Sequence, residues 1–118
     1  MSDIEMTRGD TQVYDIAVVD PMTGNPINLT GMTLAFMAKR SRSDSDASAV
    51  ISKTLGSGIA ITNVAAGLGT LTIDPADTAS VVETVQLEWD LQLVNAGQVF
   101  TLDSGYLLIR ADVKRSGT

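Results

Sequence analysis

The chain has 118 residues and a formal net charge of −6, and it contains neither cysteine nor histidine. This length suits one domain with a single hydrophobic core. The two missing residue types exclude disulfide bonds, thiolate metal sites and the usual acid and base of neutral-pH catalysis. Because the charge is negative and the eight Lys and Arg residues are scattered, we expect no nucleic-acid partner.

Residues 1–118 are expected to form one domain, with 1–9 and 114–118 as extended arms. Asp3 and Glu5 stand where a signal peptide would carry basic residues, and no apolar segment follows them. No run approaches the roughly 18 consecutive apolar residues that cross a bilayer. We therefore expect neither a signal peptide nor a membrane partner.

The first half of the chain alternates between strand and turn patterns. Segment 11–19 repeats apolar side chains every second residue, which predicts a half-buried strand. Pro, Gly and Asn crowd 20–26 and predict a reversal. Segment 32–39 predicts a second strand, whereas 40–48 has no apolar stripe and predicts a solvated loop. The inner faces of the two strands are expected to carry Tyr14, Ile16, Val18, Leu34, Phe36 and Ala38.

The middle of the chain predicts a meander of three short strands at 50–55, 58–62 and 67–73, separated by small and turn-forming residues. An aspartate directly before a proline follows them. Since aspartate is a good N-cap and proline suits the first helical position, we expect one short helical turn near 75–80.

The clearest alternation in the sequence lies at 86–94, where every second side chain is large and apolar. An Asn-Ala-Gly turn then leads into a strand at 98–102, and a last strand is expected over 105–113. Short strands with frequent turns predict an all-β fold, either a sandwich or a barrel of antiparallel strands, of which we favour the sandwich. Its core is expected to include Leu87, Trp89, Leu91, Leu93, Leu107 and Ile109.

Glu88 and Asp90 are the strongest candidates for catalysis. They lie two residues apart on one strand face, about 6.8 Å at strand rise, which falls within the range of an inverting glycosidase pair. Such a pair needs a carboxylic acid with a raised pKa in an enclosed cleft. Gln86 and Gln92 flank these two acids on the same wet face, so a solvated strand face is the better interpretation and we assign no catalytic residue.

Asp44 and Asp46 resemble the start of a calcium-binding loop. No third acid, central glycine or terminal glutamate follows at the spacing of an EF-hand. We therefore interpret this segment as a polar loop, and we expect no metal and no cofactor.

Ala35, Met37, Tyr106 and Leu108 form the candidate interface. They give apolar character to strand faces that a lone two-layer sandwich would leave wet, and contiguous apolar patches are uncommon on monomers. The first hypothesis is a subunit interface made by these four residues. The alternative is that loops or the terminal strand of the same chain cover them.

The order of motifs along the chain resembles the small immunoglobulin-like domains of tailed bacteriophages, similar to the N-terminal domain of baseplate upper proteins and to related tail, neck and fibre components. The likeness covers almost the whole chain. It is carried by Arg8-Gly9-Asp10-Thr11, Asn28-Leu29-Thr30-Gly31, Gly58-Ile59-Ala60-Ile61-Thr62, Gly67-Leu68-Gly69-Thr70, Asp74-Pro75-Ala76-Asp77 and Trp89-Asp90.

This resemblance implies an antiparallel immunoglobulin-like β-sandwich in a virion structural protein. Such a protein is not an enzyme, and it works by docking to other virion proteins in the tail, neck, baseplate or fibre-attachment region. The resemblance also implies a homo-oligomer or several symmetric copies, located in the virion after synthesis in the bacterial host cytoplasm.

Three alternatives remain open: a head decoration or cement subunit, a carbohydrate-binding module of the virion surface, and, more remotely, a glycosidase using Glu88 and Asp90. Sugar-binding faces usually present exposed aromatic rings. Here Trp89, Phe36 and Phe100 are expected in the core, which leaves few rings for a sugar.

Overall fold

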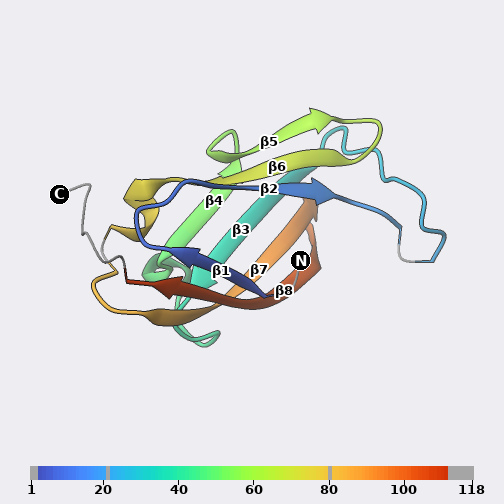
Figure 1. The fold of residues 1–118 in the computed structure, drawn as a ribbon. Coiled ribbons are helices and arrows are strands. Elements are labelled where there is room, and N and C mark those ends of the chain that lie inside the picture. Colours follow the sequence, from blue (N-terminus) through green and yellow to red (C-terminus); the bar gives the residue numbers. More distant parts are fainter. Residues whose placement is uncertain (1–2, 21, 80, 112–118) are drawn as a thin grey trace.

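The computed structural model describes residues 3–20, 22–79 and 81–111. Within these ranges the protein is all-β, and its two short helical segments are 3₁₀ turns (Figure 1). The elements are β1 (Ile4–Thr7), β2 (Gln12–Ala17), β3 (Thr33–Lys39), η1 (Asp46–Ser48), β4 (Ile51–Leu55), β5 (Gly58–Asn63), β6 (Leu68–Ile73), η2 (Pro75–Thr78), β7 (Val85–Asn95) and β8 (Gln98–Arg110).

The strands form one continuous sheet in the order β1-β8-β7-β3-β4-β5-β6-β2, nearly closed as a barrel. The pairs β1–β8 and β4–β5 are parallel and the other pairs are antiparallel, so the sheet is mixed. The expected antiparallel immunoglobulin-like β-sandwich is therefore not confirmed. Alternation predicted an inner and an outer face for each strand, but a sandwich and a barrel both bury one face, so the pattern cannot separate them.

Two glycines with positive φ lie at the junction between β4 and β5. Gly56 and Gly58 have φ angles of +87° and +100°, which glycine adopts readily and which residues with a side chain rarely adopt. The parallel contact between the two strands is only two residue pairs long, Thr54 with Gly58 and Leu55 with Ile59. This short contact joins the β3–β4–β7–β8 half of the barrel to the β5–β6–β2 half.

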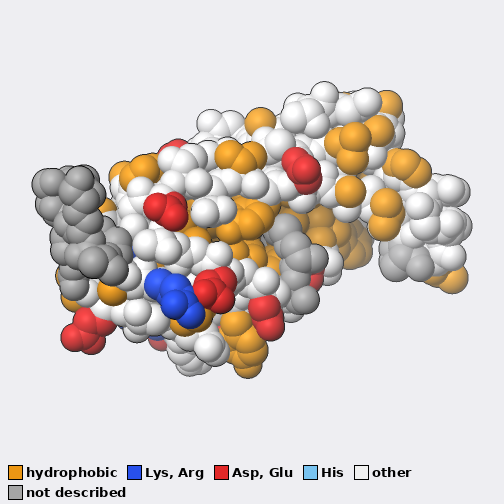
Figure 2. Space-filling view, in the orientation of Figure 1, with side chains coloured by type: hydrophobic (Ala, Val, Ile, Leu, Met, Phe, Trp, Pro, Cys, Tyr) orange, Lys and Arg blue, Asp and Glu red, His pale blue; other side chains and the backbone are white. Residues whose placement is uncertain are grey.

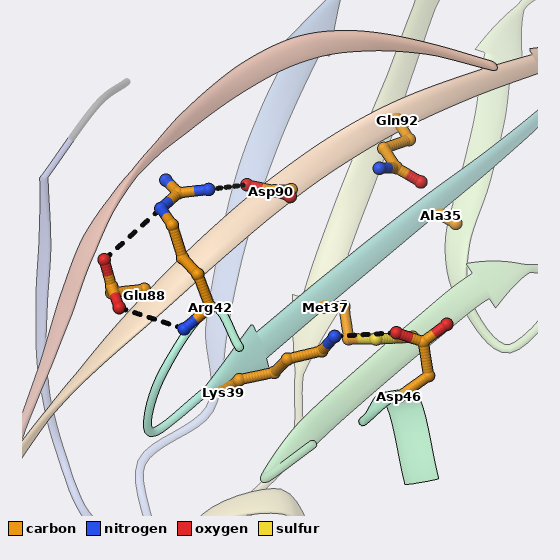
Figure 3. Close-up of a pocket in the computed structure, with 8 residues that line it drawn as sticks. All are labelled: Ala35, Met37, Lys39, Arg42, Asp46, Glu88, Asp90 and Gln92. Atoms are coloured by element: carbon orange, nitrogen blue, oxygen red, sulfur yellow. Dashed lines mark hydrogen bonds and ion pairs between the residues drawn. The ribbon is translucent and has the colours of Figure 1, made fainter. Parts of the chain in front are cut away.

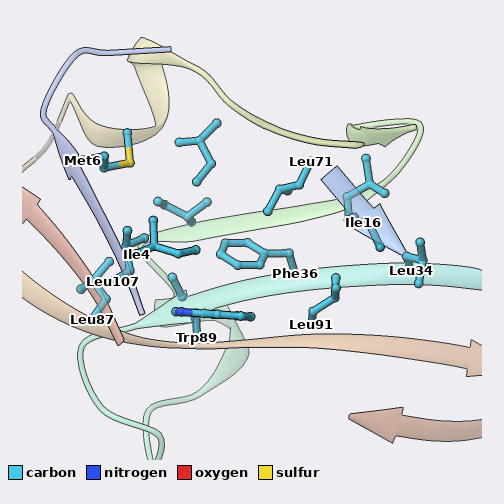
Figure 4. Close-up of a cluster of buried hydrophobic side chains, with 14 of the residues drawn as sticks. Ile4, Met6, Ile16, Leu34, Phe36, Leu71, Leu87, Trp89, Leu91 and Leu107 are labelled. Atoms are coloured by element: carbon cyan, nitrogen blue, oxygen red, sulfur yellow. The ribbon is translucent and has the colours of Figure 1, made fainter. Parts of the chain in front are cut away.

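The core lies between these two halves, where β1 and β2 cross in front of β3, β4 and β7 (Figure 1). Trp89 and Phe36 are fully buried at its centre (Figure 4). The indole Nε1 of Trp89 donates a hydrogen bond to the backbone O of Tyr106 at 3.2 Å, so its one polar atom is satisfied inside the core. Other fully buried side chains include Leu34, Leu71, Leu87, Leu107 and Ile109.

Several expected elements are confirmed. The helical turn is η2, in which the backbone N–H of Asp74 donates to Asp77 Oδ2 at 2.6 Å. The β7–β8 hairpin turns through Ala96 and Gly97, with φ of +52° and +83°. Two successive positive φ angles are typical of a type I′ turn, whose twist matches the flanking strands.

Two expectations at the ends of the chain change. Residues 1–9 were expected as an arm, but Ile4–Thr7 is β1, which pairs with β8 and buries Ile4 and Met6. Four residues are too few for alternation to reveal a strand. The separate strands expected at 98–102 and 105–113 form one strand, β8, that ends at Arg110. The arm expected at 114–118 lies outside the described residues.

Candidate functional site

The four candidate interface residues lie on one outer face of the barrel. Ala35 and Met37 are on β3, Tyr106 and Leu108 are on β8, and β7 runs between these strands. The register sets Met37 opposite Asp90 and Tyr106 opposite Glu88. Tyr106 is 49% exposed and the other three are half-buried. The two apolar pairs are therefore separated by the carboxylates of β7, so they do not form one continuous apolar patch.

Arg42 ties loop 40–48 to this face. Its backbone N–H donates to Glu88 Oε2 at 3.1 Å, and its Nη1 donates to Asp90 Oδ1 at 2.9 Å (Figure 3). Its Nε lies 3.3 Å from Glu88 Oε1. We call these three residues the Arg42 clasp. The hydrogen bond that Arg42 donates to Asp90, and then the negative charge of Asp90, raise the pKa of Arg42.

Lys39 provides a second tie. Its ammonium donates to Asp46 Oδ1 at 2.7 Å and to the backbone O of Asp44 at 3.0 Å. The carboxylate of Asp44 accepts the backbone N–H of Ser41 at 3.2 Å. Loop 40–48 is polar, as expected, and it is also bound to the barrel at two points. Since Asp44 and Asp46 already serve as acceptors for groups of this chain, the polar-loop interpretation accounts for both.

A hollow of about 180 Å³ lies under the loop, with Met37 and Ala35 on its floor and the Arg42 clasp at its rim (Figure 3). Glu88 and Asp90 share one guanidinium on an outer strand face. A glycosidase would instead need one of them as a protonated acid within a cleft that holds the sugar. The geometry thus favours a structural role for both carboxylates.

Sequence reasoning missed several exposed apolar side chains elsewhere. Val13 and Val19 are 59% and 47% exposed, and Leu68, on the strand paired with β2, is 41% exposed. Hydrophobic atoms gather at the end of the molecule where β5 and β6 meet (Figure 2). The alternation of 11–19 could have revealed the exposure of Val13 and Val19, because they fall on the same solvent-facing side of the strand as Asp15. Phe100, expected in the core, is 49% exposed.

No three His, Cys, Asp or Glu side chains gather closely enough to hold a metal ion within 3–20, 22–79 and 81–111. In the same ranges no helix is long and apolar enough to span a membrane.

Comparison with known proteins finds a structural likeness but no sequence family. No family model matches the chain, and no curated protein matches it. Among solved structures it is similar to the N-terminal domain of phage TP901-1 ORF48. The TM-score is 0.45 at 11% sequence identity, and the alignment covers 92% of this chain and 83% of that one. A TM-score below 0.5 does not establish a shared fold.

Proposed function

We propose that the protein is a virion structural protein of a tailed phage, one that acts by docking to other virion proteins and to further copies of itself. The observation that carries this proposal is the outer face of β3, β7 and β8. There, half-exposed Tyr106 and half-buried Leu108 lie on a rigid sheet beside the Arg42 clasp. The ordered motifs that resemble phage immunoglobulin-like domains point to the same class of protein.

A docking role suits the physical character of this face. It combines an aromatic anchor, apolar neighbours and a polar rim that is already hydrogen-bonded, which is the composition of many protein interfaces. Multiple symmetric copies would strengthen weak contacts through effective concentration, so no single contact has to be tight. The proposed place of docking is the tail, neck, baseplate or fibre-attachment region. The proposed role includes no catalytic step and no cofactor. We also propose that residues 1–118 act as one domain.

Head decoration is the nearest alternative, since it uses the same kind of docking face at another place in the virion. The register of β8 argues against a carbohydrate-binding module. Phe100 lies opposite the inward-facing Leu93, whereas Tyr106 lies opposite the outward-facing Glu88. The two exposed rings of β8 thus point to opposite faces of the sheet, so they cannot form one platform for a sugar.

The test is the double variant Tyr106→Glu, Leu108→Glu, compared with the wild-type chain by light scattering and by incorporation into phage particles. We expect a folded protein whose self-association and incorporation are both lost, because like charges beside Glu88 oppose docking. Tyr106→Ser, Leu108→Ser serves as a milder variant, and Thr72→Glu, on the outer face of β6, as the control. Unchanged assembly size and unchanged incorporation would overturn the proposal.

A further inference from the structure

The charged residues of this chain are unevenly distributed. Segments 21–38, 54–73 and 91–102 contain no Lys, Arg, Asp or Glu. The core of a protein interface is depleted of charged residues relative to the rest of the surface. A place where the fold brings these three segments together at the surface is therefore a candidate for contact with another protein.

The fold brings the three segments together at one end of the barrel. Leu29 donates its backbone N–H to Val64 O at 3.0 Å, and Thr33, at the start of β3, pairs with Val94. Figure 2 shows hydrophobic atoms at this end of the molecule. We call it the apolar end and define it by the described residues of 18–32, 63–68 and 94–100. Asp20 is the single charged residue in these ranges.

Most of the exposed large apolar side chains of the described residues lie at the apolar end. They are Val19, Met22, Val64, Leu68, Val99 and Phe100. Met22 is 93% exposed, yet its turn is ordered, since its backbone N–H donates to Asp20 Oδ1 at 2.8 Å. Apolar surface gathered in one place is uncommon on a monomer. The apolar end therefore has the character of a surface that another protein covers.

The outer face of β3, β7 and β8 suits an uncharged partner. Glu88 and Asp90 are paired with Arg42, and Asp46 is paired with Lys39, all within one copy of the chain. A partner surface with its own charges would compete with these ion pairs, whereas an uncharged surface leaves them intact. Beside them the face offers apolar contact, namely the floor of the 180 Å³ hollow and the exposed tyrosine ring of β8.

Charge also decides how two copies can meet through this face. A face-to-face contact sets Glu88, Asp90 and Asp46 of one copy against the same residues of the other, and like charges across an interface oppose association. A contact of the apolar end with the face sets only Asp20 against these carboxylates. Since each copy has a net charge of −6, the second arrangement is the more favourable one.

We propose that the apolar end of one copy docks onto the outer face of β3, β7 and β8 of the next copy, head to tail. This inference rests on the proposed function, since it names a second copy of this chain as the partner of that face. The contact joins two different surfaces, so each pair of copies keeps one free face and one free end. Further copies then add until the row closes into a ring, or they continue as a filament, according to the rotation between neighbours.

The test mixes two variants, each disabled on one surface. Tyr106→Glu, Leu108→Glu disables the face, and Val64→Glu, Leu68→Glu disables the apolar end at two exposed side chains. In light scattering we expect each variant alone to be a monomer. An equimolar mixture should give a dimer and nothing larger, because the intact end of the first variant binds the intact face of the second. Thr72→Glu, farther along β6, is the control and should assemble as the wild-type chain does.

Three results overturn the inference. The first is wild-type assembly by a folded Val64→Glu, Leu68→Glu chain. The second is a mixture that stays monomeric although both variants are folded by circular dichroism, since only a contact between two different surfaces can be restored by mixing. The third is a wild-type chain that stays monomeric at every concentration. Should the glutamate variant of the apolar end fail to fold, Val64→Ser, Leu68→Ser replaces it, and the same results decide.

The outcomes separate this inference from the proposed function. If the face variant is lost from phage particles but the mixture does not associate, the head-to-tail contact is overturned and the proposed function stands. If the mixture associates but the wild-type chain is absent from particles, the proposed function is overturned and the head-to-tail contact stands.

Discussion

The ring of Phe36 lies against the indole of Trp89 at the centre of the barrel, with centroids 5.6 Å apart and planes tilted by 32°. Neither side chain has exposed surface. Their strands are neighbours, and the register sets Ala38 opposite Trp89 and Phe36 opposite Leu91. The two rings therefore form a diagonal cross-strand pair, which fastens β3 to β7 from the inside.

Trp89→Ala is expected to destabilise the protein by about 3 to 5 kcal/mol, since it leaves a large cavity in a closed core. That is much of the roughly 5 to 15 kcal/mol that a domain has in total. Trp89→Phe loses the Nε1 hydrogen bond to Tyr106 but keeps a ring in the core. It should therefore destabilise the protein less than Trp89→Ala does. Urea unfolding measures both variants, and an equal cost for the two would contradict the packing argument.

Gly58→Ala is expected to destabilise more than Gly56→Ala. Both glycines have positive φ, so each alanine carries a conformational cost of about 1 to 2 kcal/mol. A Cβ at Gly56 meets nothing within 4 Å, whereas one at Gly58 meets the Cδ of Lys53. The side chain of Lys53 is only 9% exposed and its Nζ lies 2.7 Å from Asp77 Oδ2, so it has little freedom to move. Overpacking should add about 1 to 3 kcal/mol. Equal melting temperatures for the two variants would refute this.

Arg42→Ala is expected to loosen the 41–44 part of loop 40–48 without unfolding the barrel, because the clasp lies on the outer face and the bond from Lys39 to Asp46 remains. Amide hydrogen exchange should become faster over 41–44, and raising the salt concentration should produce a similar change in the wild-type chain, because exposed ion pairs are screened. Arg40→Ala, two residues away, is the control. Equal exchange rates in Arg42→Ala and the wild-type chain would mean that the clasp does not hold the loop.

Tyr14 is expected to make stability depend on pH in the alkaline range. Burial raises the pKa of Tyr14 above its ordinary value of about 10, because it disfavours the phenolate. The folded state therefore holds this proton more tightly than the unfolded state does. The resulting stability is complete below about pH 10 and is lost as the pH rises through the folded pKa. Unfolding measured from pH 9 upward should show this loss, and Tyr14→Phe should reduce it.

Period-two alternation predicted most of the strands and the side chains that they bury. Leu87, Trp89 and Leu107 are inside as expected, since alternation follows directly from strand geometry. The closure of the sheet could not be read from the sequence. It depends on the parallel β1–β8 and β4–β5 pairs, and parallel pairing leaves no local turn signal.

The candidate surface was predicted only in part. Outward positions on β3 and β8 identified Met37 and Tyr106, whose role in an interface stays a prediction. The Arg42 clasp was not predicted. Arg42 is separated in the sequence from Glu88 by 46 positions and from Asp90 by 48, and loop 40–48 shows no pattern that fixes its conformation. Val13 and Val19 could have been found from the sequence by applying the same alternation to the outer face of 11–19.

The pairing of β1 with β8 brings Ile4 beside Leu107. During synthesis on the ribosome, β1 cannot pair with β8 until almost all the later strands have emerged. The hairpin of β5 and β6 needs no such wait, since its partners follow each other within a few residues. Ile4 and Met6 are therefore exposed to solvent in the nascent chain. At this stage the protein is most prone to aggregation.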